Sequence, residues 1–364
     1  MIKGKKKWWI AGGFSVFILY IFAAPRPVPP EIVVTPRWLS SLESDFPVVL
    51  NGEASGNAGV FPFMLGDRFG YVDTAGRFLV NKTKEGGVAL SEKYWAEYAG
   101  EPSAIDVRDS SGQAAFRIEN GAGYPLFLDG RVFVVGKYQN SLTALDGEGE
   151  ILWTYDFAAP VTCLDAAAGF VLAGSLDGTV ELLDADGKRI FFFVPGGSRL
   201  PVIAGCALSR DGSRFGIVSG VDGQRFLLFE RFGERGNREY RVVYHEFLDE
   251  GFRRPVFISF IDGDNRVVFE RAGGIGIYTI SSRSGLSVEL NGEIAAIDRE
   301  GSGGVFFAVT SQSALQKRLV AVRLPGSVVM EAPFKSRDVF FYREGSRLYT
   351  GGGSTLASFE LEKK

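Results

Sequence analysis

A short turn signature that recurs along most of the chain limits the fold more than any other feature. In residues 170–193, FVLAGSLDGTVELLDADGKRIFFF, short apolar runs are interrupted by Asp177-Gly178 and by the turn from Asp184 to Gly187. Turn residues between β-branched and aromatic runs predict three short antiparallel strands. With residues 160–165 in front they form a four-stranded meander. Such a meander cannot bury both of its faces alone, so it has to be one of several stacked units.

The turn at Asp184 serves as a probe for further units. An aspartate three residues before a glycine ends an apolar strand at steps of 36, 37 and 38 residues, at Asp73, Asp109, Asp146 and Asp184. The aspartate can hydrogen-bond its own backbone two residues on, and glycine accepts the positive φ of a tight hairpin. A looser match continues at steps of 46, 52, 41 and 37 residues, at Glu230, Ser282, Arg323 and Glu360. The chain therefore contains eight copies.

Prolines give a second marker, because proline is tolerated at the first residue of a strand. They precede apolar runs at Pro47, Pro125, Pro160, Pro201 and Pro255. The predicted units are residues 46–82, 88–120, 124–157, 160–195, 201–247, 255–291, 293–334 and 338 onward. The last unit lacks a fourth strand, and we expect residues 31–35 to complete it, since closure removes an open edge.

These units predict an all-β fold, an eight-bladed β-propeller of four-stranded antiparallel blades over residues 31–364. Forty-seven glycines and 31 phenylalanines agree with many turns and an aromatic interior. Seven blades is the alternative, if the irregular second unit or the long fifth unit is divided wrongly.

The N-terminus carries a membrane signal. Residues 1–7 form a basic tail, and the seventeen residues from Trp8 to Ala24 carry no charge. The lysines should stay in the cytoplasm and residues 25–364 should be exported. We favour a single-pass transmembrane anchor over a cleaved signal peptide, because the apolar segment is long and Pro25 is a poor residue to follow a cleavage point. Four prolines in residues 25–30 predict a stiff spacer.

The units resemble the quinoprotein-type (pyrroloquinoline quinone-like, WD40-like) β-propeller repeat, with SLTALDGEGEILWTYDF and TVELLDADGKRIFFF as the best matches. Eight blades and export also resemble the barrel-assembly propeller lipoproteins of Gram-negative outer membranes, although the lipid-anchoring cysteine of those proteins is absent. The quinone-dependent enzymes of this fold carry adjacent cysteines and a docking tryptophan in most blades. Here no cysteines are adjacent, and only Trp153 falls at the docking position. No cofactor is therefore expected.

The residues that carry chemistry are few. His245 is the only histidine, and we interpret it as an ordinary residue of an outer strand. Cys163 and Cys206 fall in the first strands of neighbouring units, where free buried thiols are favoured over a disulfide. Asp262 to Asn265, the nearest approach to a calcium loop, is interpreted as a hairpin turn. The glycine runs at residues 272–276 and 351–353 precede no predicted helix and are interpreted as strand ends or bulges.

The sequence therefore assigns no catalytic, cofactor-binding or metal-binding residue. One polar excursion, residues 232–241, is a solvated loop or a partner-contacting loop, with candidate contacts at Arg231, Glu234, Arg235, Arg238 and Arg241. A net charge of −3 and the lack of a basic patch beyond the N-terminus argue against nucleic acid.

The predicted function is a membrane-anchored, exported, non-enzymatic scaffold for protein interactions in the cell envelope, with outer-membrane protein assembly as one setting. Its partners would be the membrane, through residues 8–24, and envelope proteins. The alternatives are a propeller enzyme, either a hydrolase or lyase or a degenerate quinoprotein, and a ligand-sensing ectodomain.

Overall fold

The computed structural model describes residue 17 and residues 32–43, 48–49, 59–100, 104–119, 123–233, 239–249 and 251–363. By their contacts the residues form two compact units, Met1–Thr35 with Leu361–Lys364, and Pro36–Glu360. The predicted tail, anchor and spacer at residues 1–30 lie outside the described residues, apart from Phe17. Among the residues that are described, no helix is both long and apolar enough to cross a membrane.

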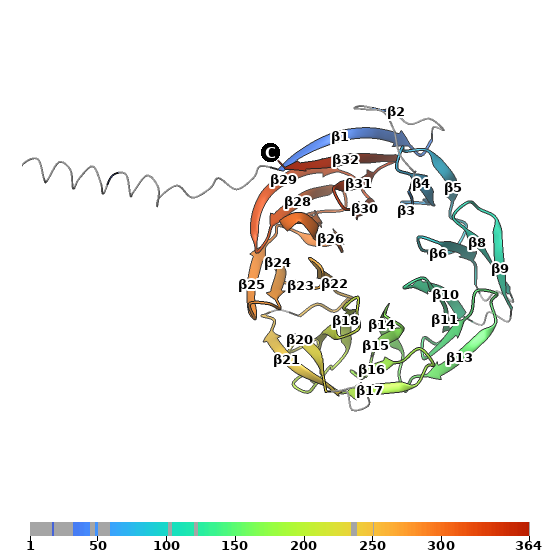
Figure 1. Ribbon diagram of the computed structural model, residues 1–364, viewed down its shortest axis with the longest axis vertical. Helices are drawn as coiled ribbons and strands as arrows, with labels where there is room; N and C mark the ends of the chain where they lie inside the picture. The colour runs from blue at the N-terminus through green and yellow to red at the C-terminus, as the bar shows by residue number, and fades with distance from the viewer. Residues whose placement is uncertain are drawn as a thin grey trace, which may run out of the picture. The chain divides into compact units, whose positions relative to one another are not determined.

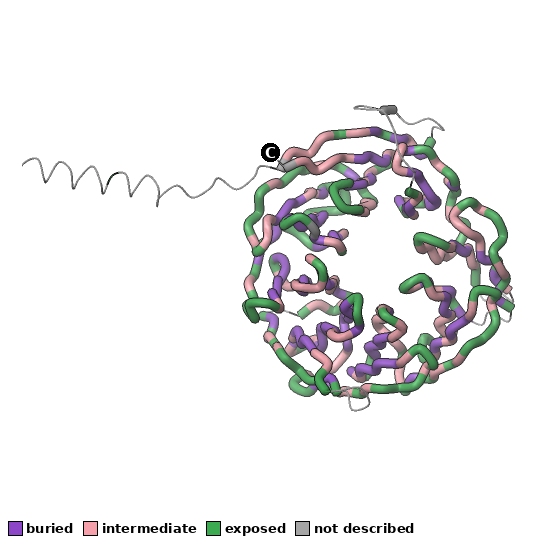
Figure 2. The backbone as a smooth tube through the Cα atoms, viewed as in Figure 1, coloured by how far each residue is buried: buried purple, intermediate pink, exposed green. Residues whose placement is uncertain are grey.

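The unit Pro36–Glu360 is a ring of eight antiparallel sheets around a common axis (Figure 1). In seven of these sheets the strands follow one another in sequence order, with the first strand nearest the axis and the last at the outer rim. Buried residues gather in the middle of the blades and exposed residues along the rim (Figure 2). This is the predicted eight-bladed propeller.

Six blades contain four strands each. The second to fourth blades consist of β6 (Gly87–Leu90), β7 (Tyr94–Tyr98), β8 (Ala104–Asp109), β9 (Ala114–Glu119), β10 (Gly123–Leu128), β11 (Arg131–Gly136), β12 (Ser141–Leu145), β13 (Ile151–Asp156), β14 (Val161–Ala167), β15 (Phe170–Ser175), β16 (Val180–Leu183) and β17 (Arg189–Phe193). The fifth to seventh consist of β18 (Ile203–Leu208), β19 (Arg214–Ser219), β20 (Arg225–Phe232), β21 (Glu239–Phe247), β22 (Ile258–Ile261), β23 (Arg266–Arg271), β24 (Gly274–Thr279), β25 (Ser284–Glu289), β26 (Glu293–Ile297), β27 (Val305–Ser311), β28 (Gln316–Arg323) and β29 (Ser327–Lys335), with the 3-10 turn η1 (Ser302–Gly304) between β26 and β27. All six agree with the predicted units.

The eighth blade is closed by the N-terminal part of the chain. Its sheet has the order β2-β1-β32-β31-β30, made of β30 (Val339–Glu344), β31 (Arg347–Gly352), β32 (Thr355–Lys363), β1 (Ile32–Ser41) and β2 (Val48–Val49). The prediction that an N-terminal strand completes the last blade is confirmed, although the strand is longer than expected and continues to Ser41. Just past it, the Leu42 N–H donates to Ser354 O at 2.8 Å.

The first blade differs from the prediction. We expected the run after Pro47 to open this blade, but Val48 and Val49 pair with Leu39 and Trp38 and so extend the eighth sheet. The first blade consists of β3 (Val60–Leu65), β4 (Arg68–Asp73) and β5 (Phe78–Thr83). The start of the first unit at residue 46 was therefore wrong. An apolar run behind a proline indicates a strand but does not say which sheet the strand joins.

The repeated aspartates hold the turns before the outermost strands. In the four regular copies one carboxylate oxygen accepts hydrogen bonds from the N–H groups two and four residues on, at 2.9–3.1 Å, and the acceptors are Asp73, Asp109, Asp146 and Asp184. The glycines that follow have φ values from +75° to +93°. These acidic residues are occupied by the backbone and shape the hairpins.

The hydrophobic core lies between blades rather than within them. Each of seven clusters combines residues of two adjacent blades, as in the cluster of Leu172, Leu182, Ile203, Phe215 and Phe229 between blades four and five. Because a middle strand packs against a neighbour on each side, β16 is buried at every position. A blade can therefore be stable only within the ring.

Two tryptophans fix neighbouring blades to each other. Trp153 Nε1 donates to Ala185 O at 2.8 Å, and its ring covers Gly187, where a Cβ would lie 2.5 Å from the ring. Trp38 repeats this contact across the closure, with a 2.9 Å hydrogen bond to Thr74 O and its ring over Gly76. The sequence had identified only Trp153. The closing strand thus repeats the contact that Trp153 makes between blades three and four.

Candidate functional site

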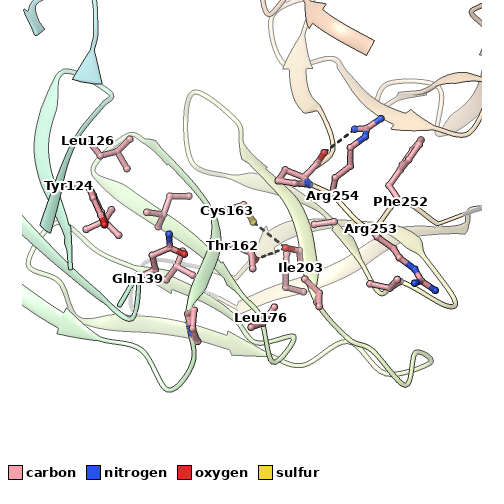
Figure 3. A pocket seen from close by; sticks show the side chains of 18 of the residues that line it. Tyr124, Leu126, Gln139, Thr162, Cys163, Leu176, Ile203, Phe252, Arg253 and Arg254 are labelled. Carbon is pink, nitrogen blue, oxygen red and sulfur yellow. Dashed lines mark hydrogen bonds between the residues drawn. The ribbon is translucent and has the colours of Figure 1, made fainter. Parts of the chain in front are cut away.

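One cavity opens on one face of the ring and spans blades two to six. Its volume is about 900 Å³. Tyr124 and Leu126 lie on one side, Thr162, Cys163 and Ile203 in the middle, and the segment from Phe252 to Arg254 on the other side (Figure 3). The site is built from many blades, and each contributes a few side chains.

The prolines that mark strand starts also form part of the cavity wall. Pro125, Pro160 and Pro255 all line it. A proline lacks an N–H, so it places an apolar ring beside the innermost strand without leaving a donor unpaired. The prolines were therefore the signal in the sequence that could have located this site. Most other lining residues are aliphatic or aromatic.

The polar groups in the wall are largely engaged. The Thr162 hydroxyl lies 2.5 Å from Ile203 O and 3.0 Å from Gly174 O, at an irregularity in the pairing of β14. Arg254 donates to both Glu270 carboxylate oxygens at 2.7 and 3.1 Å. Arg253 is exposed at the rim. Among the residues described, the cavity wall is thus mostly apolar, with the exposed Arg253 at its edge.

The two cysteines meet beside this cavity. Cys163 lines it, and Cys206 lies buried behind in the neighbouring first strand; both thiols are free, as the sequence favoured. Contact with the Cys163 thiol, followed by burial, raises the pKa of the Cys206 thiol. A raised pKa keeps a thiol protonated, so Cys206 is a poor nucleophile at neutral pH.

Asp165 is a half-buried carboxylate on β14, two residues after Cys163. Its oxygens accept from the Leu208 N–H at 2.7 Å and from the Ala166 N–H at 2.9 Å. Burial raises the pKa of Asp165, and the two backbone donors partly oppose this. The contact with Leu208 joins blades four and five, which is a structural role.

The described ends of the predicted partner loop lie apart from the cavity. Arg231, at the end of β20, places its guanidinium 5.9 Å from the Phe170 ring, and Arg241 donates to Glu239 at 2.8 and 3.1 Å. Val221, which lines the cavity, precedes the opposite end of β20. Glu234, Arg235 and Arg238 lie outside the described residues, so the loop stays a prediction.

The other candidates are structural. His245 is exposed on β21, opposite Leu227, with its ring 6.2 Å from that of Phe247. In the turn once compared with a calcium loop, Asp262 pairs with Arg266, and Asp264 accepts from the Arg210 N–H at 2.8 Å.

The two glycine runs fall within or beside β24 and β31, as interpreted. Within the ranges that the structure describes, no three His, Cys, Asp or Glu side chains are placed to hold a metal.

Comparisons with known proteins agree with this architecture. A family model described as beta-propeller protein matches residues 1–364. A Treponema pallidum (strain Nichols) protein described as uncharacterized is 24% identical over 367 residues, covering 99% of this chain and 95% of its own. The crystal structure of BamB from Moraxella catarrhalis is similar, with a TM-score of 0.59, 15% identity, and coverage of 90% of this chain and 100% of that one. The computationally designed Ika8 protein gives a TM-score of 0.58 at 15% identity, with coverage of 84% and 94%.

Proposed function

Because the chain belongs to the beta-propeller protein family, we propose that it is a non-enzymatic scaffold whose cavity face binds an apolar segment of a partner protein. The observation that carries the proposal is the cavity itself. It has about 900 Å³ of space, walls of aliphatic and aromatic side chains, and wall hydrogen bonds made within the protein. Such a surface gains free energy by burying apolar groups and offers little to activate a substrate.

The rim of the cavity fits this role. Leu176, in the turn between β15 and β16, and Leu200, just before β18, are both exposed by about half. Tyr124 stands at the other side of the opening. Exposed apolar groups around an apolar cavity are the pattern of a binding site, since isolated surface leucines would not be gathered at one opening.

The proposed setting is the cell envelope. Lysines before residue 8 and the uncharged residues 8–24 support a single-pass anchor with the propeller on the far side of the cytoplasmic membrane. The likeness in fold to BamB is in keeping with the sequence resemblance to barrel-assembly propeller lipoproteins. We therefore propose a partner protein in the cell envelope. Protease added to spheroplasts should digest the propeller and spare a short N-terminal fragment that stays in the membrane.

The scaffold proposal is tested by recovering partners with the full-length protein in detergent. Leu176→Glu should reduce recovery of a stoichiometric partner by about tenfold, because it places a charge at a position that the apolar segment of the partner would bury. The matched control is Leu315→Glu, an equally exposed leucine (58% against 51%) in the equivalent turn of blade seven, outside the cavity. Recovery of no stoichiometric partner, or equal losses in both variants, would contradict the proposal.

A ligand-sensing role is the second candidate, because the cavity volume also suits a small apolar molecule. Native mass spectrometry of the purified full-length protein separates the two. A bound small molecule that is lost in Leu176→Glu would favour sensing, and an empty cavity would favour the scaffold.

A further inference from the structure

The outermost strand of blade four differs from the other outer strands. In a strand at the rim, every second side chain points outward. In β17 and the residue after it, these outward side chains are Ile190, Phe192 and Val194. All three are exposed, while Phe191 and Phe193 between them pack against the core. The outward row of this edge strand is therefore wholly apolar.

The outward rows of the other blades contain polar groups. Among the outer strands that the structure describes in blades two to seven, the exposed rows include Arg117 and Glu119 in β9, Thr154 and Asp156 in β13, His245 in β21, Ser287 and Glu289 in β25, and Glu331 in β29. Charged side chains on edge strands normally prevent pairing with other chains. In β17 only Arg189, at the start of the strand, is charged.

That single charge is already engaged. Arg189 donates to the Glu181 carboxylate at 3.1 Å and lies 5.0 Å from the Phe192 ring centroid. Glu181 also accepts from the Tyr155 hydroxyl of blade three at 2.5 Å. These contacts hold the edge in position rather than shielding it.

From this edge we infer that β17 is a docking site for an extended segment of a partner protein, which pairs with it as an added strand. The molecule contains a precedent, because β2 pairs antiparallel with the outer edge of the closing sheet. The uninterrupted apolar row is also only one strand wide, since Thr154 and Asp156 interrupt the row of β13 and His245 interrupts that of β21. A membrane or a globular domain would need a broader patch, whereas one strand with alternating apolar residues matches this surface.

The edge continues toward the candidate site. Residues 195–200 connect β17 to the cavity rim, and they are fixed to blade five by hydrogen bonds of the Asp222 carboxylate with Arg199 at 2.9 and 3.1 Å. A partner strand on β17 would thus lead toward Leu200. The inference does not depend on the scaffold proposal, because it concerns a different surface.

The test measures amide hydrogen exchange of the full-length protein in detergent, with and without a synthetic peptide of about nine residues that alternates valine and threonine. Pairing should slow exchange of the β17 amides by about tenfold, because their free edge becomes hydrogen-bonded. Phe192→Lys should remove this protection. Val329→Lys, at a similarly exposed valine of the outer strand of blade seven (41% against 50%), should leave it unchanged.

Three results would overturn the inference. The first is peptide-induced protection that is absent from β17 or appears only around the cavity. The second is protection of β17 without peptide that grows with protein concentration, which would make the occupant a second copy of the chain. The third is equal loss of protection in both lysine variants. Thermal unfolding midpoints equal to that of the wild type show that each variant is folded.

Discussion

The closure of the ring by Trp38 gives the sharpest prediction. The Trp38 side chain is 4% exposed, donates to Thr74 O at 2.9 Å, and packs 6.1 Å from the Tyr349 ring. Replacing a buried tryptophan by alanine costs about 3–5 kcal/mol. Leaving the Thr74 carbonyl without its donor adds about 1 kcal/mol. Trp38→Ala should therefore destabilise the propeller by about 4–6 kcal/mol.

The matched control is Trp153→Ala, which removes the same hydrogen bond and glycine contact between blades three and four. Trp153 is partly exposed and joins blades that are continuous in the chain, so the loss should be smaller, about 2–3 kcal/mol. Urea unfolding of the full-length protein measures both. Hydrogen exchange of β32 should rise only in Trp38→Ala, because release of β1 leaves β32 as an edge. A smaller loss for Trp38→Ala than for Trp153→Ala, or unchanged exchange of β32, would refute the reasoning.

Substitutions at three further positions test individual contacts. Asp298→Ala removes the carboxylate that pairs with the Arg343 guanidinium at 2.7 Å. The side chains of Arg343 and Asp298 are 4% and 0% exposed, so urea unfolding should show a loss of stability of about 3–5 kcal/mol. Asp73→Ala removes two backbone hydrogen bonds and should cost about 1–3 kcal/mol in the same assay, whereas Asp73→Asn keeps an acceptor and should cost less. Burial raises the pKa of Asp165, so the folded chain binds a proton more tightly than the unfolded chain and stability falls as pH rises from the ordinary aspartate pKa through the raised one. Asp165→Asn should remove that fall from a plot of unfolding midpoint against pH.

The fold could be predicted because a recurring turn pattern in the sequence marks the strands of successive blades. In blades one to four the aspartate and the glycine of this turn lie three residues apart, and the turn uses both, so the same local pattern recurs in the sequence. Closure was predicted for a different reason, since an open last blade has to find a strand. The destination of Val48 and Val49 could not be predicted, because their partners, Trp38 and Leu39, are chosen by packing in the closed ring. The docking role of Trp38 was hidden for the same reason.

The prolines at strand starts were a signal of the candidate site in the sequence, but they did not show which residues meet there. The lining residues lie between Tyr98 and Pro255, most are ordinary apolar residues, and they come from inner strands and turns of five blades. Only the ring brings these residues together. The charged residues of the loop 232–241 are conspicuous in the sequence. In the structure, leucines and prolines form the more distinctive surface. A search for exposed apolar side chains at turns between second and third strands would have found Leu176 in blade four, but it would also have selected Leu315 in blade seven.

The closure contacts and the candidate binding surfaces lie in different parts of the ring. The contacts that close the ring lie between blades seven, eight and one. They are the Asp298–Arg343 ion pair, the added strands β1 and β2, and the Trp38 contact. Blades two to six carry the cavity, and the apolar outer edge lies at blade four, near the middle of that sector. Closure requires fixed contacts at one seam, because loss of one strand there opens the whole ring. Recognition surfaces are therefore best placed away from the seam, where a partner can add contacts without competing with those that hold the ring closed.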